Sequence, residues 1–361
     1  MRRALFSAIL AVLAALPAGA DQAAEESLEK FFTGWFSVCP GTRVSARALP
    51  EIAIPGYPAY RVERQCELKN RGQSVVALVD RASREVFVGE VLHSSERRGA
   101  GFAPEKDVPV LEGVLQDAYG VPASIEMLPG ARGPLLPIRV ALLQAPGATA
   151  AVAGFVSQDG ATVLLGAFHP LSGDPAAIRE SLLAASSGVR PSNSAFYVTA
   201  FIDFQCERCR ARTAKVRDFV WTRGGALEIR FLPLVKVHDW AFAAAETAAA
   251  LANISPSAYL KYEEAIFPRA GAMTAAGARE LGADVADGAG VREAFDAELS
   301  SGRARQRVVR DIDLALSLGL NGTPIFFFRG AELTSDRGLA EAAIGSALSG
   351  GGKGAGAGSG R

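Results

Sequence analysis

The stretch that decides the fold reads Phe201-Ile202-Asp203-Phe204-Gln205-Cys206-Glu207-Arg208-Cys209. It joins a hydrophobic, strand-like segment (196–202) to a helix-like segment (210–221). A thiol at the start of a helix faces unpaired backbone N–H groups and the positive end of the helix dipole, and both favour the thiolate. The second cysteine follows on the same helical face, where it can resolve a mixed disulfide. The pattern therefore predicts a redox dithiol in which Cys206 attacks and Cys209 resolves.

Two other interpretations of this cysteine pair are half of a zinc site and a structural disulfide. A zinc site needs two more ligands at similar spacing, and none follows nearby. Asp203, at the end of the strand-like segment, also has two interpretations, and the sequence leaves both open. It is either a partly buried acid that relays protons or tunes Cys209, or a cap for the turn into the helix.

The amino terminus has the features of a secretory signal peptide over residues 1–20. A basic start (1–3) precedes an apolar run (4–16), and Ala18-Gly19-Ala20 forms a small-residue cleavage site. The apolar run is too short for a comfortable membrane span. We therefore expect an exported protein, soluble after cleavage, in a periplasm of the Gram-negative type, where disulfides persist.

The charge and the length of the chain exclude several classes of protein. Its 361 residues include 38 basic and 38 acidic side chains, so the formal net charge is zero. This balance gives no electrostatic reason to expect binding to nucleic acid or to an anionic membrane. The chain exceeds the length of one ordinary domain, and its four cysteines do not make it a disulfide-stapled mini-protein. We expect two or three domains that are stabilised by hydrophobic cores.

The first half contains a faint internal repeat of a helical pattern, a strand and a hairpin. The matched segments are Leu28-Phe31-Phe32-Trp35 with Leu111-Val114-Leu115-Tyr119, 60–62 with 138–140, and 75–93 with 151–169. Gly89 and Gly166 occupy matching positions in the two hairpins. The repeat predicts two α+β units, residues 21–107 and 108–185, each with one helix on a small antiparallel sheet.

The second half begins after a predicted linker, residues 186–195, which is rich in Ser, Gly and Pro. The redox half (196–348) contains an Ala-rich helical insertion over 239–318 that is broken at Pro256 and Pro268. Residues 349–361 are nearly all Gly, Ala and Ser. Such a segment cannot bury enough apolar surface to fold, which predicts a disordered tail.

The remaining cysteines and the histidines predict structural roles. Cys39 and Cys66 lie in the first unit and have no counterparts in the second. In an oxidising compartment we expect them to form one structural disulfide, worth about 3 kcal/mol by loop-closure entropy. A second redox pair is the alternative, but neither cysteine begins a helix. His93, His169 and His238 are scattered and predict no metal site, and we expect His238 to be a structural cap.

The redox half resembles the DsbA family of thiol-disulfide oxidoreductases. The resemblance runs from Phe196 to about Ala347 and is carried by Phe-x-Asp-Phe-x-Cys and, far downstream, by Asn321-Gly322-Thr323-Pro324. It implies an α/β thioredoxin fold with an inserted helical domain. In that family the proline is cis beside the reactive cysteine, and the preceding residue's backbone pairs with the substrate chain. The resemblance thus implies a cis Pro324 and a substrate-binding Thr323.

One departure from the family concerns the two residues between the cysteines. The most oxidising members usually carry Pro and then an aromatic residue or His, whereas this chain has Glu207 and Arg208. Arg208 favours a nearby thiolate, and Glu207 opposes it although a carboxylate suits the first helical turn. The two residues tune the thiol in opposite directions. The choice between oxidase and isomerase therefore stays open.

The resemblance implies an exported thiol-disulfide oxidoreductase that acts on protein substrates with cysteines and needs no cofactor. A redox partner would lie at the inner membrane or in the periplasm. The amino-terminal tandem region is similar, at the level of fold, to the cystatin-like dimerisation domain of the DsbC and DsbG isomerases, which implies either client binding or a homodimer through this region. Two alternatives are a non-catalytic chaperone or adaptor and a copper(I) chaperone that uses the same cysteines.

Overall fold

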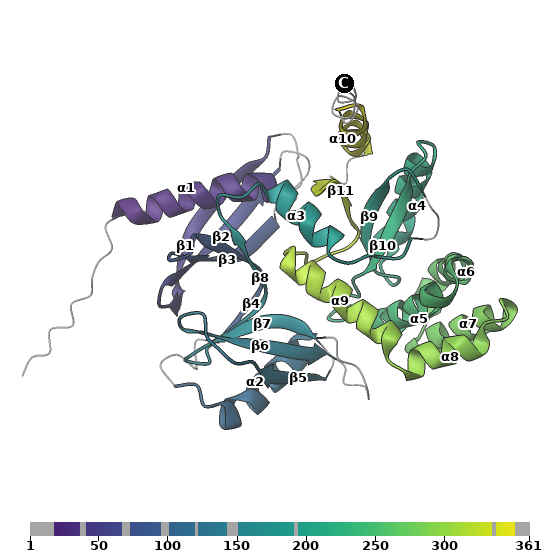
Figure 1. The fold of residues 1–361 in the computed structure, drawn as a ribbon, viewed down its shortest axis with the longest axis horizontal. Helices are drawn as coiled ribbons and strands as arrows, with labels where there is room; N and C mark the ends of the chain where they lie inside the picture. Colours follow the sequence, from purple (N-terminus) through teal and green to yellow (C-terminus); the bar gives the residue numbers. More distant parts are fainter. Residues whose placement is uncertain are drawn as a thin grey trace, which may run out of the picture.

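The computed structural model describes residues 18–36, 41–66, 73–94, 101–119, 122–142, 151–190, 194–333 and 337–350. They form an amino-terminal sheet with helices α1 to α3, and a carboxy-terminal sheet with helices α4 to α10 (Figure 1). Residues 1–17 of the predicted signal peptide and 351–361 of the predicted tail lie outside the described residues. Helix α1 (Ala18–Trp35) begins within the predicted cleavage site. None of the described helices is long and apolar enough to span a membrane.

The amino-terminal part is one antiparallel sheet of eight strands in the order β1-β2-β3-β4-β8-β7-β6-β5. The strands are β1 (Arg43–Ile54), β2 (Tyr57–Gln65), β3 (Gln73–Asp80), β4 (Glu85–His93), β5 (Ala123–Met127), β6 (Leu135–Leu142), β7 (Val152–Ser157) and β8 (Thr162–Pro170). The two predicted units therefore share a sheet, because β4 of the first pairs along its whole length with β8 of the second. This pairing covers two sheet edges that would otherwise expose unpaired backbone groups.

Two glycines allow β4 and β8 to approach each other closely. Gly89 and Gly166 are direct partners across the two strands, with φ of 156° and 145°. A Cβ atom on Gly89 would lie 2.2 Å from Leu165 O, and one on Gly166 would lie 2.3 Å from Val88 O. Any other residue would push the strands apart. The repeated glycine of the sequence thus marks the place where the two halves of the sheet meet.

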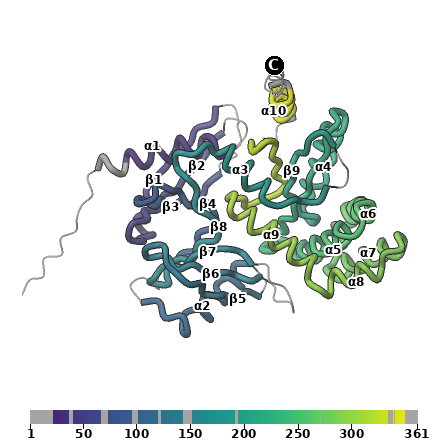
Figure 2. Tube along the Cα trace, viewed as in Figure 1, coloured from purple at the N-terminus to yellow at the C-terminus, as the bar shows by residue number. Residues whose placement is uncertain are grey.

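Helices α1 and α2 (Pro104–Tyr119) pack on the sheet, and α3 (Pro175–Ala184) packs on α1. The apolar residues of α1 in the repeated pattern, Leu28, Phe31, Phe32 and Trp35, are buried against β2, β3 and β4. In α2 the corresponding residues Leu111, Leu115 and Tyr119 are buried, but Val114 is 41% exposed. Helix α3 has no counterpart in the repeat; it lies beside α1 and leads toward the second sheet (Figure 2).

The carboxy-terminal sheet has four strands in the order β10-β9-β11-β12. They are β9 (Tyr197–Ile202), β10 (Ala226–Phe231), β11 (Ile325–Phe328) and β12 (Ala331–Leu333). Strand β10 runs parallel to β9, and β11 runs antiparallel to it. Helix α4 (Glu207–Trp221) connects β9 with β10, and α10 (Arg337–Gly350) ends the described chain. The parallel pair places the carboxyl ends of β9 and β10 at one edge of the sheet.

The predicted insertion is a series of helices between β10 and β11. They are α5 (Ala241–Ile254), α6 (Pro256–Ile266), a 3₁₀ helix (Phe267–Ala272), α7 (Ala275–Gly288), α8 (Arg292–Ser300) and α9 (Arg303–Ser317). Pro256 occupies the first turn of α6, where the missing N–H costs nothing, and Ser255 caps that helix by accepting from Ala258 N. The expected break at Pro256 is therefore the start of a new helix.

Helix α9 joins the two parts of the molecule. It packs on β4, β7 and β8 on one side and on α5 on the other (Figure 1). Two buried or partly buried hydrogen bonds cross this contact, from Trp35 Nε1 to Leu318 O (3.1 Å) and from His169 Nε2 to Ser317 O (2.9 Å). An exposed hydrogen bond joins Ala153 N to Asp313 Oδ1 (2.9 Å). Residues of α2 and β6 belong to the same hydrophobic core as residues of β9 and α9.

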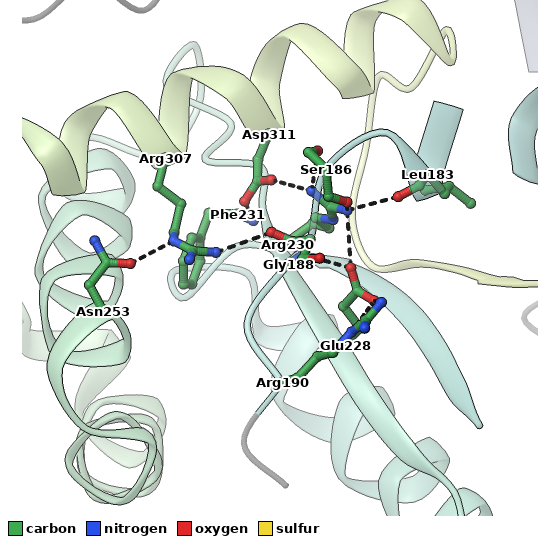
Figure 3. A network of polar contacts seen from close by, with 11 residues as sticks. Leu183, Ser186, Gly188, Arg190, Glu228, Arg230, Phe231, Asn253, Arg307 and Asp311 are labelled. Carbon is green, nitrogen blue, oxygen red and sulfur yellow. Dashed lines mark hydrogen bonds and ion pairs between the residues drawn. The ribbon is translucent and has the colours of Figure 1, made fainter. Parts of the chain in front are cut away.

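A buried ionic network attaches part of the predicted linker to β10 (Figure 3). Arg230, 1% exposed, forms ion pairs with Glu228 and Asp311 and donates to Ser186 Oγ and Leu183 O. Glu228 also accepts from Gly188 N at 2.6 Å. Val189 and Ile229 form a β-bridge. These contacts fix residues 183–190, while 191–193 lie outside the described residues.

Candidate active site

The two cysteines of the Cys-x-x-Cys motif lie where the central strand β9 turns into α4. Cys206 is the N-cap residue of α4, with extended φ and ψ of −76° and 108°, and Cys209 lies in the first turn. The Cys209 N–H donates to Cys206 O at 2.9 Å. Both are free thiols, 6% exposed for Cys206 and fully buried for Cys209. Only Cys206 therefore presents its sulfur near the surface.

The two thiols differ strongly in acidity. The pKa of Cys206 is lowered to about 5, chiefly because the Cys209 thiol donates a hydrogen bond to its sulfur, and burial opposes this shift. The pKa of Cys209 is raised, first by burial and then because it is the donor to Cys206. A thiolate at the helix start also benefits from the dipole of α4. Cys206 is thus suited to attack, while Cys209 keeps its proton.

The Thr323–Pro324 segment lies beside Cys206. The peptide bond between the two residues is cis, as the family resemblance implies. The Cys206 thiol donates to Thr323 O at 3.7 Å, within hydrogen-bond range for sulfur. Thr323 is 7% exposed, and its contacts also lower the pKa of both thiols. The structure therefore brings together the dithiol and the segment expected to bind substrate, although they are far apart in sequence.

The Asp203 side chain is fully buried, and its carboxylate accepts hydrogen bonds from three separate groups. Its Oδ1 accepts from Gln205 N (2.7 Å), and its Oδ2 accepts from Leu234 N (2.7 Å) and from His238 Nδ1 (2.8 Å). It therefore does cap the turn that leads into α4. Its charge also acts on the dithiol, because it opposes the negative charge of the Cys206 thiolate and so raises that pKa. The hydrogen bonds thus fit the capping role, whereas the proton relay or tuning of Cys209 stays a prediction.

The sequence indicates only a structural cap for His238, whereas in the structure its ring contacts Asp203. The signal lies in the topology: Ile202 and Phe231 are partners at the ends of the parallel strands β9 and β10, so the residues that follow both strands meet at one edge. The His238 side chain is 22% exposed, and it connects the buried carboxylate with solvent. The Gln205 side chain lies at the same edge. Its amide nitrogen donates to Asp239 Oδ1 (2.9 Å), and its amide oxygen accepts from Trp240 N (3.1 Å).

Glu207 and Arg208, the residues between the cysteines, point to solvent. The Glu207 side chain is 88% exposed and lies 3.9 Å from Arg210, its closest ionic partner in the described structure. Charges so exposed are screened by water and salt. Their influence on Cys206 is therefore weaker than that of the buried Asp203.

The other predicted site residues lie away from this site. Cys66 follows β2 and is disulfide-bonded, whereas Cys39 lies outside the described residues. His93 contacts Thr162 Oγ1 (2.9 Å) in the first sheet, and His169 contacts α9. Within the described residues, no three His, Cys, Asp or Glu side chains gather as they would around a metal ion.

Comparison with known proteins finds one matching family model and several similar solved structures. Residues 192–343 match the family model described as thioredoxin. No curated protein matches the chain. Similar solved structures include the thiol-disulfide exchange protein alpha-DsbA2 from Wolbachia pipientis (15% identity, TM-score 0.39, covering 49% of this chain and 99% of that one). A thioredoxin-like oxidoreductase from Silicibacter pomeroyi DSS-3 is also similar (22%, TM-score 0.34, 44% and 87%).

Oxidised BdbD from Bacillus subtilis is a further similar structure (18% identity, TM-score 0.34, covering 42% of this chain and 87% of that one). The family match includes β9, the Cys-x-x-Cys turn, the inserted helices and the Thr323–Pro324 segment. The predicted thioredoxin fold with a helical insertion is confirmed. Residues 192–343 therefore form a thioredoxin-fold domain with a helical insertion.

Proposed function

We propose that this protein is an exported, periplasmic thiol-disulfide oxidoreductase that exchanges disulfides with protein clients through Cys206 and Cys209. The observation that carries the proposal is the Cys206 thiol, which begins α4, lies 3.7 Å from Thr323 O and has a pKa lowered to about 5. At neutral pH this cysteine is a thiolate, which is the form that attacks disulfides.

The same geometry supports a two-step exchange. The Cys206 thiolate attacks a client disulfide, one client sulfur leaves as a thiolate, and a mixed disulfide joins Cys206 to the other. Cys209 then loses its proton and attacks the Cys206 sulfur, which releases the second client thiolate and closes the Cys206–Cys209 disulfide. Oxidation of a client is the same sequence in reverse. Re-oxidation of the dithiol would need a separate redox partner.

We propose the oxidising direction for this exchange. A lowered thiol pKa stabilises the reduced protein, so its disulfide form is the stronger oxidant. A pKa of about 5 for Cys206 lies between the values of about 7 for thioredoxin and about 3.5 for DsbA. We therefore expect a reduction potential between those of the two proteins, about −270 and −120 mV. Equilibration with glutathione buffers would measure it.

The direct test is reduction of insulin in the presence of dithiothreitol. We expect turnover by the wild-type protein and none by Cys206→Ser. In a separate incubation without dithiothreitol, reduced Cys209→Ala should accumulate mixed disulfides with insulin, because it cannot release clients. Thiol-sensitive complexes on a non-reducing gel would report that accumulation. Client binding without turnover by the wild-type protein would instead support a chaperone or adaptor. Homodimer formation stays a prediction that light scattering can check.

A further inference from the structure

A pocket of about 410 Å³ lies between the amino-terminal sheet and the thioredoxin-fold domain. One wall comes from β3 and β4, including Ser74, Val76 and Val91; the opposite wall comes from the loop after β10 and from the segment before β11, including Leu234 and Asn321. Neither part of the molecule forms this pocket alone. Its lining is mostly apolar, and its size is that of sites for one or two large side chains or a small ligand.

The two charged side chains in the pocket lining, Glu90 and Lys236, neutralise each other as an ion pair. Lys236 Nζ lies 2.6 Å from Glu90 Oε1, and the other carboxylate oxygen of Glu90 accepts from Tyr119 OH. Lys236 also lies over the Tyr119 ring at 4.8 Å. Glu90 and Lys236 are the charged members of the described lining, and they form this ion pair between the two parts. The pocket therefore offers neutral, apolar surface, which excludes a charged ligand and favours an apolar side chain.

Two short chain segments connect the pocket lining with the reactive thiol. Asn321 lines it two residues before Thr323, whose carbonyl accepts from Cys206. Leu234 lines it as well, and its N–H donates to Asp203 beside the dithiol. Two residues of extended chain span roughly 7 Å. In an extended client, residues two apart project to the same face, so a neighbour of the client cysteine can reach this pocket. Val237, on the pocket lining, is 71% exposed and widens the apolar surface.

We propose that this pocket binds an aliphatic or aromatic side chain of the client polypeptide, two to four residues from the client cysteine on one side. The proposal rests on the proposed function and adds a substrate preference to it. It also assigns a role to the amino-terminal sheet, which supplies one wall of the client site. Clients would then be recognised as unfolded segments in which a cysteine lies near an apolar residue.

The test uses short synthetic peptides whose single cysteine carries a thiopyridyl group. The Cys206 thiolate of the reduced protein attacks the peptide sulfur, and pyridine-2-thiolate leaves, takes up a proton and is read by its absorbance. One Leu is moved through each position of a Gly/Ser peptide. We expect the rate to rise about tenfold or more, as partial burial of one leucine predicts, at a position on one side of the cysteine only.

Substitutions on the amino-terminal sheet then test whether the leucine preference arises in this pocket. Ser74 is an exposed residue of β3 that lines the pocket, so Ser74→Trp fills the pocket without disturbing the core. Ser45→Trp, on an exposed position of β1 that lies outside the pocket, is the matched control. We expect Ser74→Trp to abolish the leucine preference and Ser45→Trp to keep it. The all-Gly/Ser peptide should react equally with all three proteins, which also checks that the variants fold.

Each other outcome decides against one specific idea. Equal rates for all leucine positions in the wild-type protein would overturn the pocket proposal, and this scan needs no variant. A preference that survives Ser74→Trp would place the apolar contact elsewhere. Absence of any Cys206-dependent thiolate release would overturn the proposed function itself.

Discussion

Cys206 and Cys209 differ in pKa although they lie at the same helix start, because Cys209 is more deeply buried and donates the hydrogen bond that the Cys206 sulfur accepts. We predict that alkylation of the reduced protein follows the lowered pKa of Cys206, about 5. The iodoacetamide rate should rise as the thiolate forms, reach half its plateau near that pH, and modify Cys206 alone up to mildly alkaline pH. Mass spectrometry identifies the modified residue. Faster modification of Cys209 would reverse the assignment of nucleophile.

The same pKa difference predicts how the stability of the reduced protein depends on pH. In the unfolded chain a cysteine has a pKa of about 8.5, and in the folded protein Cys206 has about 5. The thiolate therefore stabilises the fold fully above the unfolded value, and this stability is lost as the pH falls through the folded value. We expect the melting temperature of the reduced protein, relative to Cys206→Ser, to decrease from pH 8 to pH 4. A flat difference would contradict this.

Asp203 is the buried charge that opposes the thiolate, which gives its removal a defined direction. We predict that Asp203→Asn lowers the pKa of Cys206 further, since it removes a negative charge that raises it. The variant should also cost about 1–3 kcal/mol of stability, because the amide nitrogen cannot accept the hydrogen bonds that the carboxylate accepts. Alkylation across pH and urea unfolding measure the two effects.

Asp239→Asn is the matched control, because that exposed carboxylate lies near the site but bonds only the Gln205 side chain in the described structure. We expect little change in either measurement for this variant. If Asp203→Asn raised the pKa of Cys206, the carboxylate would act through the position of the turn and not through its charge.

At the scale of elements, the network around Arg230 fixes the linker, β10 and α9 to one another. Arg230 and Asp311 are 1% and 3% exposed at their side chains, and Asp311 also accepts from Phe231 N at 3.0 Å. We predict that Arg230→Met destabilises the protein by about 3–5 kcal/mol, because it leaves the buried Asp311 carboxylate without its cation. Arg190→Met removes a 45% exposed partner of Glu228 and should cost about 0–1 kcal/mol. Urea unfolding compares them; equal losses would contradict the argument from burial.

Helices and strands with a strong local sequence pattern could be predicted. Features that depend on contacts with residues distant in sequence could not. Strand β9 and the inserted helices follow from apolar runs, Ala-rich segments and the positions of Pro256 and Cys206. The edge strand β1 has mostly exposed residues and contains Pro50, which an edge tolerates, so it has no clear strand pattern. The hairpins of the repeat were recognised, but their union was not, because the pairing of Gly89 with Gly166 depends on a long-range contact.

The same distinction holds for the site. The helix start, the two cysteines and the Thr323–Pro324 segment are readable as motifs, because each is a short run of characteristic residues. His238 is a lone histidine in sequence, and its contact with Asp203 exists only because β9 and β10 end side by side. The pocket between the two parts of the molecule could not be predicted, since its walls come from segments that no local pattern relates.

At the scale of the whole molecule, the two parts depend on each other through buried polar contacts as well as through a shared core. Arg179 of α3 is 2% exposed and donates to three carbonyls: Gly330 O (2.5 Å) after β11, and Trp35 O (2.6 Å) and Gly34 O (3.0 Å) in α1. Burial lowers its pKa to about 10, so it stays charged at neutral pH. One side chain thus ties the first helix of the chain to the second sheet.

We predict that Arg179→Met loosens this connection. Two buried carbonyls, Gly330 O and Trp35 O, lose a charged donor. This loss should cost about 2 kcal/mol or more, since each unsatisfied buried group carries a penalty of about 1–3 kcal/mol. In calorimetry the wild-type protein should unfold in one main transition, because α9 and the shared core couple both parts. The variant should show an earlier, separate transition of one part.

Arg329→Met is the control, because that exposed arginine bonds only Ala347 O in the described structure and joins no two parts. It should leave the single transition unchanged. A wild-type protein that already unfolds in two separate steps, or an Arg179→Met variant that unfolds like the wild type, would show that the two parts are merely adjacent. The pocket between them would then lack a fixed geometry, and the rate preference proposed for apolar clients should weaken in the Arg179→Met variant as its parts separate.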